Sequence, residues 1–515
     1  MFKILIWKEI REHLMTFRFA AALVTTLLLV IISVWVLGDD FQRRRDAYNL
    51  AAEESARNDM QVVVPSQIRP TVHRAPSVLS IFAQGEDRRF GNTVLVQRWE
   101  VPRRAEGSFT DNMLLAAEPA LDLYTIFALV VSLFGILFSY DAVSGERERG
   151  TLKIQCSVGA GRAPILVSKL LGGIICLAIP FIFSFLSGLL LLSLFFGMSF
   201  TGEQWSAVAM MLLAGLVYGG LFVATGLTCS ALMRKSSAAL ILSLLVWAIG
   251  VLLLPSAAAN AAGVIAPLPS SAELANAEKT SLQEAAAALE EFGKVHPRYW
   301  TGLLTGGWSI PGRGGCFKFD GGVAHYVDGA AWVHTIEPIM QRRAGRIWDL
   351  YNGLEERRLN HSRMFDLISA ASPAMHLRKA FTSLAITDYQ AYGGFLESAR
   401  RHRRLILSQL ESRGYFADNA WQFFSRRPTS EITDDLYAQR HAYLEEQMAL
   451  GKRGDEILDP VIAWGFLAKD EIPQFAYTEP ASDFGVALLH IGVLVAMLCF
   501  AFAIGLVAIL RYDVR

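Results

Sequence analysis

Six stretches of the chain are long enough and apolar enough to cross a membrane. Their predicted limits are residues 17–37, 121–140, 164–196, 205–232, 238–255 and 484–510. A spanning helix needs about 20 mostly apolar residues. The third stretch is the longest, and we expect a kink at Pro180, because proline removes a helical hydrogen bond. Gly215 and Gly219 in the fourth stretch predict close helix packing. The pattern therefore predicts an all-α polytopic membrane protein with six transmembrane helices.

Residues 1–16 predict an amphipathic helix ahead of the first span. Its apolar positions recur every fourth residue, at Phe2, Ile6, Ile10 and Leu14. Between them lie the residues expected to face the membrane surface or a partner, namely Lys3, Trp7, Lys8, Glu9 and Arg11. A helix of this kind lies in the interface between lipid and water.

Two long polar segments, residues 38–120 and 256–483, interrupt the apolar pattern. Valine-rich runs at 60–64 and 93–101 predict strands in the first segment. The second predicts helices at 271–292, 334–359, 364–383, 392–413 and 431–448, with a glycine-rich loop at 301–322. We expect the two segments to assemble one mainly helical α+β ectodomain from two insertions.

The short polar segments orient the chain. Residues 141–163 hold four basic residues, Arg234 and Lys235 form the next short turn on that side, and residues 511–515 are a basic tail. Basic residues in short loops mark the cytoplasmic side. Both termini are therefore expected in the cytoplasm, and the long polar segments outside it.

The overall charge and the cysteines exclude several function classes. The net charge is +0, so nothing points to nucleic acid as a partner. The five cysteines form no Cys-x-x-Cys pair, and the histidines show no metal-ligand spacing. We therefore expect no metal site, although eight histidines fall in the long polar segments.

No catalytic constellation is present in the sequence. There is no Gly-x-Ser-x-Gly elbow, and the pairs Glu290-Glu291 and Glu355-Glu356 fit solvated helix faces. The basic run 400–404 would fit a contact with anionic lipid headgroups or a partner near the membrane, but it predicts rather an exposed helix face paired with Glu397 and Glu411. The chain is accordingly not expected to be an enzyme.

The densest charge in the chain is the block Ser144-Gly-Glu-Arg-Glu-Arg-Gly-Thr-Leu-Lys153. Glutamates and arginines alternate within one helical turn, and Gly150 can end that turn. The block fits a solubilising loop with orienting charges. It also fits a short helix at the membrane surface that contacts a partner with charges of both signs.

This block, with Asp141 before it, resembles the loop after the second span of type-2 ABC-transporter permeases. The six spans and the amphipathic first helix match that family too. A second motif, Ser372-Pro-Ala-Met-His-Leu-Arg-Lys-Ala-Phe-Thr-Ser-Leu-Ala-Ile-Thr-Asp-Tyr389, resembles a branch with a large ectodomain between spans five and six. That branch includes permeases of copper-enzyme maturation and gliding-motility systems. Ile386 stands where the branch has glycine.

The resemblance implies that a coupling element docks on a separate ATPase and that residues 1–16 add a second contact. The coupling element comprises Ser144, Gly145, Glu146, Arg147, Glu148, Arg149, Gly150, Thr151 and Leu152. Two ATPase subunits would bind ATP and Mg²⁺, since this sequence has no Gly-x-x-x-x-Gly-Lys-Ser/Thr loop and is expected to bind no cofactor itself. A second permease, identical or paralogous, would complete the transporter.

The implied function is export or extrusion across a bacterial inner membrane, driven by that ATPase. The alternative is a mechanical or scaffold subunit whose ectodomain acts on a periplasmic partner without moving a substrate. The spans hold few polar residues, which favours a lipid-like substrate or none.

Overall fold

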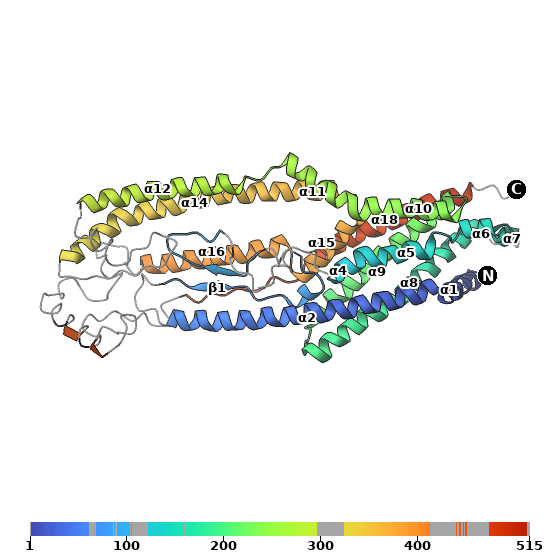
Figure 1. Ribbon diagram of the computed structural model, residues 1–515, viewed down its shortest axis with the longest axis horizontal. Coiled ribbons are helices and arrows are strands. Elements are labelled where there is room, and N and C mark those ends of the chain that lie inside the picture. The colour runs from blue at the N-terminus through green and yellow to red at the C-terminus, as the bar shows by residue number, and fades with distance from the viewer. Residues whose placement is uncertain are drawn as a thin grey trace.

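The first helix and the end of the last helix lie at the same end of an elongated molecule (Figure 1). The computed structural model describes residues 2–60, 68–85, 87, 90–103, 105, 122–157, 161–295, 324–412 and 473–511, with 439, 442–443, 446 and 449–450. The predicted strand at 60–64, the loop at 301–322, the helix at 431–448 and the last four residues lie wholly or mostly outside these ranges.

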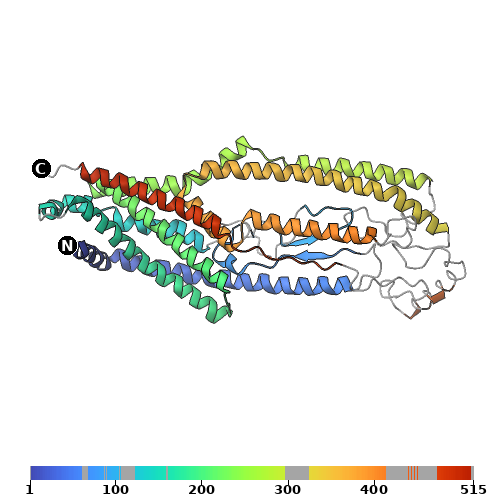
Figure 2. The same cartoon turned by 180° about the vertical axis from the view of Figure 1, so that it is seen from behind.

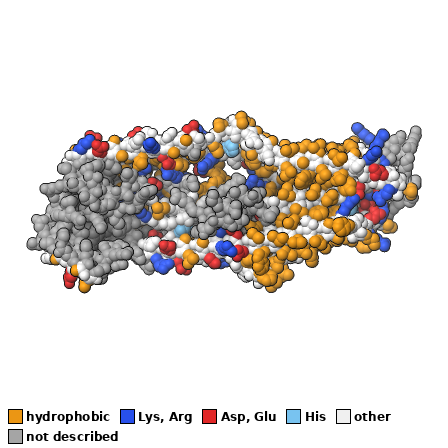
Figure 3. Space-filling view, in the orientation of Figure 1, with side chains coloured by type: hydrophobic (Ala, Val, Ile, Leu, Met, Phe, Trp, Pro, Cys, Tyr) orange, Lys and Arg blue, Asp and Glu red, His pale blue; other side chains and the backbone are white. Residues whose placement is uncertain are grey.

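Six helices of the described residues are long and apolar enough to cross a membrane, which confirms the predicted fold class. They are α2 (Phe17–Met60), the succession Leu123–Glu148, α8 (Arg162–Phe196), α9 (Gly202–Leu232), the succession Ser236–Ile265, and α18 (Phe484–Leu510). Figure 3 shows apolar side chains covering this half of the molecule. The chain is thus a multi-pass membrane protein.

Helix α9 forms the centre of the membrane half. It packs against α18, α8, α5 (Ser132–Ser139) and α10 (Ser236–Trp247). In the apolar stretch of α9, 67% of the residues are buried, whereas 17% are buried in that of α18. A side chain at Gly215 would meet the Phe181 ring at 2.8 Å, and one at Gly219 would meet Leu177 at 2.9 Å. Both glycines thus lie where neighbouring helices approach closely.

Two spans continue beyond their predicted ends. The helix of the first span runs on from residue 37 to Met60, because the polar residues after Leu37 form helical pairs such as Arg43–Asp39 at 2.8 Å. The fifth span does not stop at Pro255. A π-helical segment, η4 (Ala248–Leu253), leads into α11 (Leu254–Ile265), and Leu253 and Leu254 keep helical backbone angles, so the helix continues through Pro255.

The extramembrane half is mainly helical, with one small sheet. Strands β1 (Thr71–His73) and β2 (Thr93–Leu95) pair antiparallel in the register Val72↔Val94. They lie between α2 and α16 (Tyr389–Ser412) in Figures 1 and 2. The ring of His73 in β1 lies 2.8 Å from the hydroxyl of Ser55 in α2 and 3.0 Å from the hydroxyl of Thr93 in β2.

Two long helices of this half, α12 (Ser271–Val295) and α14 (Ala324–Ser369), lie side by side along its upper edge in Figures 1 and 2. The predicted helix boundary near residue 360 is wrong, because α14 continues to Ser369 and α15 (Pro373–Ala385) begins only after it. The break precedes Pro373, since a proline disfavours helical conformation in the residue before it.

The turn after α15 joins the two insertions. Ile386 adopts a left-handed conformation with φ of 59°, which costs a residue with a side chain roughly 1–2 kcal/mol and explains why glycine suits this position. Arg74 donates to the Ile386 carbonyl at 2.8 Å. Gly85, with φ of +51°, has no room for a side chain, because Thr387 O would lie 2.4 Å from its Cβ.

The basic run on α16 is only partly the solvated face that its composition predicts. Arg404 pairs with Glu397 at 2.8 Å. Arg403, however, is buried and donates to the Gln97 carbonyl at 3.0 Å, and His402 is buried against the Phe475 ring. Burial lowers the pKa of His402 to about 4.

Acidification is expected to destabilise the extramembrane half through His402. The pKa of His402 in the folded protein, about 4, lies below the ordinary value of 6.5. Its contribution to the free energy of unfolding is therefore fully present above pH 6.5 and is lost as the pH falls towards 4. The loss between pH 7 and pH 5 is up to about 2 kcal/mol. Thermal unfolding of the purified protein and of His402→Leu at both pH values measures this. An equal pH dependence in the two proteins would contradict the assignment.

Candidate coupling site

The charged block forms two short helices at the end of the membrane half where α1 and the end of α18 lie. Helix α6 is Ser144–Glu148 and α7 is Thr151–Ser157. Gly150 separates them with φ of +73°, a conformation that glycine adopts without strain. The predicted single turn is therefore a helix–glycine–helix element. Charged side chains of both signs gather at this end in Figure 3.

Helix α6 is attached to the turn between α9 and α10. Arg147 donates to the carbonyls of Met233 at 2.9 Å and Ala231 at 3.2 Å, at the C-terminus of α9. The hydroxyl of Ser230 accepts from the backbone N–H of Ser144 at 2.9 Å. A cation is favourable at the negative end of a helix dipole, so Arg147 satisfies the last carbonyls of α9 and holds α6 there.

The next residue, Glu148, contacts the start of the following helix. Its carboxylate accepts from the backbone N–H of Ser236 at 3.0 Å and from the Ser236 hydroxyl at 2.8 Å. These bonds satisfy an unpaired N–H in the first turn of α10, where an anion is favourable. The alternating charges of the block thus match the opposite dipole ends of two consecutive helices.

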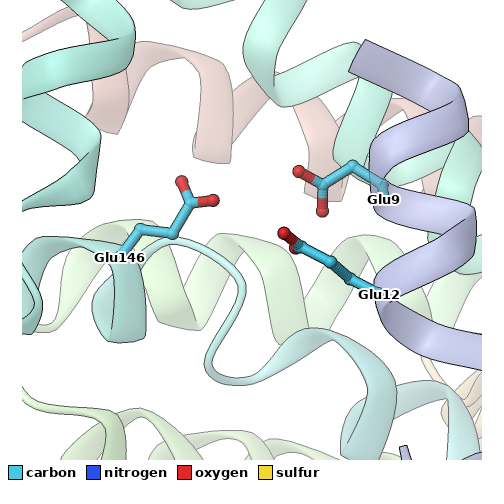
Figure 4. A group of neighbouring side chains, drawn as sticks. All are labelled: Glu9, Glu12 and Glu146. Atoms are coloured by element: carbon cyan, nitrogen blue, oxygen red, sulfur yellow. The ribbon is translucent and has the colours of Figure 1, made fainter. Parts of the chain in front are cut away.

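Glu146 points the other way, into a buried ion-pair network. Lys169 of α8 lies 2.8 Å from Glu146 and 2.9 Å from Glu9 of α1 (Phe2–Leu14). The side chains of Lys169, Glu146 and Glu9 are 2%, 5% and 7% exposed. Figure 4 shows Glu9 and Glu12 pointing from α1 towards Glu146. Lys169 therefore joins the first helix to the coupling element.

Lys8 and Gln155 complete the network. Lys8 lies 3.2 Å from Glu146, and Gln155 donates to Glu146 at 2.9 Å. Burial lowers the pKa of Lys8, but the carboxylates of Glu146, Glu9 and Glu12 outweigh it and raise that pKa above 10.5. The three carboxylates lie close enough to hold a metal ion. Lys169 and Lys8, however, already supply the positive charge that they need, and the arrangement is that of an ion-pair network.

Two further contacts fix this end of the molecule. Arg18 at the start of α2 forms a bidentate pair with Asp141, at 2.9 and 3.0 Å, just before α6. Gly172 of α8 lets α1 approach, since a Cβ at that glycine would lie 2.7 Å from the Cβ of Glu9. The first helix therefore rests directly on the backbone of α8.

The structure divides the predicted coupling and interface residues into two groups. Ser144, Glu146, Leu152 and Glu9 are buried, and Gly145, Arg147 and Lys8 are partly buried within the attachments. The exposed group contains Lys3, Trp7, Arg11, Glu148, Arg149, Gly150 and Thr151. Among apolar side chains, Ile4, Trp7 and Ile154 are 72%, 68% and 63% exposed.

Sequence reasoning missed Lys169 and Arg18 as members of this site, included Asp141 only in the motif that carries the resemblance, and placed Glu9 on the exposed face. One signal was available. Lys169 is the only charged residue in the long apolar run 164–196, and a charge inside a span is a functional candidate by default. Its two partners are 160 and 23 residues away along the chain, so their identity depends on the fold.

Comparison with known proteins places this chain in a family. The family described as ABC-2 family transporter protein matches residues 4–295, more than half of the chain. A domain of unknown function, DUF3526, matches residues 324–433. The probable ABC transporter permease protein NosY of Stutzerimonas stutzeri is 28% identical over 130 residues, 25% of this chain and 47% of that protein. The match thus spans about half of that relative's length. The chain belongs to the ABC-2 family of transporter proteins, as a multi-pass permease.

Proposed function

We propose that this chain is the membrane subunit through which a separate ATPase drives export or extrusion across a bacterial inner membrane. One observation carries the proposal. The exposed surface of α1, α6 and α7 is joined by Lys169, Arg147 and Glu148 to three different spans. A push on this surface therefore reaches α8, α9 and α10 together.

The proposal implies the following assembly. Two ATPase subunits would bind ATP and Mg²⁺ beneath the coupling element, and a second permease, identical or paralogous, would complete the membrane dimer. The segments on the proposed cytoplasmic side contain the basic residues Lys3, Arg11, Arg149 and Arg162. Basic residues are favoured in short cytoplasmic segments next to membrane spans. The extramembrane half would then be periplasmic.

A mechanical role is the second candidate, and one feature favours it. The fifth span continues without interruption into α11, which packs against α14 of the extramembrane half. Within the described membrane half, the apolar space bounded by Leu177, Phe181 and Gly219 leaves no room for a water molecule. This close packing is compatible with a substrate path between two permeases, and equally with an extramembrane half that acts on a periplasmic partner.

The exposed residues give the sharpest test of ATPase docking. We expect Arg149→Glu and Ile154→Asp each to weaken binding of the cognate ATPase by roughly 10- to 30-fold, the scale of an interface hot spot. Affinity is measured in nanodiscs, together with thermal unfolding. Arg45→Glu, an exposed charge reversal on the extramembrane part of α2, is the matched control. Glu146→Lys is a poor probe, because Glu146 is buried against Lys169. Unchanged affinity in both variants would exclude this surface.

A further inference from the structure

The helix of the fifth span runs from the coupling element through the membrane half to the extramembrane half. Ser236–Ile265 comprises α10, η4 and α11. At 1.5 Å per residue it is about 45 Å long. We call it the span-5 helix. It begins at the coupling element and ends beside α14 (Figure 1).

The lower end of the span-5 helix is held by the coupling element. Glu148 binds both the backbone N–H and the hydroxyl of Ser236. Above this contact α10 packs on α9 and buries Ala239 and Ser243, while its other side chains are exposed or partly exposed. A displacement of Glu148 would act directly on the first turn of this helix.

The middle of the span-5 helix carries two lateral hydrogen bonds at the start of the π-helical segment. The indole N–H of Trp247 donates to the hydroxyl of Ser132 at 2.8 Å. Ser132 is the first residue of α5, directly after a second π-helical segment, η3 (Phe127–Val131). Helix α5 leads down to α6. The coupling element thus reaches the span-5 helix twice, through Ser236 and through Trp247.

The second lateral bond leads into the extramembrane half. Ser372 occupies the N-cap position of α15, where a serine hydroxyl ordinarily accepts from the N–H groups of its own helix. Here the hydroxyl makes no such bond and donates at 2.7 Å to the carbonyl of Gly250 in η4. A π-helical segment displaces the regular hydrogen-bond pattern, and the Gly250 carbonyl takes Ser372 as a partner.

The upper end of the span-5 helix contacts the α12–α14 pair. Helix α11 packs along α14, and the ring of His361 on α14 lies 2.9 Å from the carbonyl of Ala266, the residue after α11. Helix α14 in turn packs against α12. A displacement of α11 would therefore move both long helices.

We propose that the span-5 helix transmits movement of the coupling element to the α12–α14 pair, with Trp247 and Ser372 as positioning residues. Trp247 keeps the helix in register with the second span. Ser372 ties its π-helical segment to the extramembrane motif that begins with α15. This inference rests on the proposed function, because the ATPase supplies the movement.

Hydrogen exchange of the full permease–ATPase complex in nanodiscs tests the proposal. The complex is compared without nucleotide and after trapping with ATP and vanadate. We expect trapping to change amide exchange in α12 and α14 of the unmodified protein. In Ser372→Ala and Trp247→Phe we expect this change to be lost while ATPase binding and basal ATP hydrolysis remain. Ser372→Thr keeps the hydroxyl and should restore the change.

Two control variants alter a serine and a tryptophan that have no part in the proposed transmission. Ser256→Ala removes a hydroxyl of α11 that donates at 2.9 Å to the carbonyl of Leu252 in η4, within the span-5 helix. Trp205→Phe alters an exposed tryptophan of α9. Both should behave as the unmodified protein. A merely structural role of Ser372 would lower the melting temperature without abolishing the nucleotide-dependent change.

The outcomes separate this inference from the proposed function. If trapping alters exchange in the membrane half but never in α12 and α14, the transmission proposal is wrong and the ATPase-driven function stands. If both variants keep the full change in α12 and α14, Trp247 and Ser372 are not positioning residues. If the ATPase does not bind the unmodified protein, the proposed function fails and this inference fails with it.

Discussion

Lys169→Met is expected to destabilise the protein by about 3–5 kcal/mol, the usual cost of removing one partner from a buried ion pair. The lysine is 2% exposed and lies within 2.9 Å of both Glu9 and Glu146. Without it, two buried carboxylates lose their buried cation, and Glu146 keeps the partly exposed Lys8 and the amide of Gln155 as partners. Thermal or denaturant unfolding in detergent measures the loss.

Two comparisons make this prediction specific. Lys294→Met removes a lysine whose pairing with Glu290 is exposed, and exposed pairs contribute no more than about 1 kcal/mol. The triple variant Glu9→Gln/Glu146→Gln/Lys169→Met removes the uncompensated charge and should recover much of the stability. A loss in Lys169→Met no larger than that in Lys294→Met would show that Lys169 does not hold the site together.

Gly172→Ala is expected to separate the first helix from α8. The added Cβ would lie 2.7 Å from the Cβ of Glu9, which is too short for any real contact. Overpacking of this kind costs about 1–3 kcal/mol. Because Glu9 would also move away from Lys169, stimulation of the ATPase should fall together with stability. ATP hydrolysis by the reconstituted complex and its melting temperature are the measurements.

The control for Gly172→Ala is the same substitution at Gly492. Gly492 lies within α18 and has open space around its Cβ position. In a helix interior, glycine to alanine is otherwise favourable by up to about 1 kcal/mol. The two variants should therefore differ in sign. Equal effects at Gly172 and Gly492 would show that α1 does not depend on this close approach.

Both predictions concern how the coupling element is held rather than what it binds. Arg147 and Glu148 complete the ends of α9 and α10, and Glu146 reaches Lys169. Of the four consecutive residues Glu146 to Arg149, three attach the element to neighbouring spans, and the side chains of Glu148 and Arg149 are exposed. These attachments would let the proposed coupling element pass a movement to several spans.

The hydrophobic pattern by itself determined the six spans and the two insertions. Apolar runs of membrane length admit few alternatives, because an unpaired backbone group in lipid is costly and only a helix satisfies it locally. The limits of α18, residues 484–510, agree with the prediction to the residue. The coupling block also carried its own signal, since its charge density is unlike that of its neighbours.

Only the tertiary structure decided the partners of that block and the ends of several helices. The pairing of Glu9 with Lys169 joins residues 160 positions apart, and no local pattern encodes such a separation. The fifth span passes Pro255 because a π-helical segment precedes it, and the extension of α2 depends on the contacts that its polar residues make. The periodicity of apolar residues predicts which face of a helix is buried. The partners of a buried charge depend instead on which residues the fold brings near it. The sequence therefore determined which segments cross the membrane, and the packing of α1, α6 and α8 decided how these segments are joined.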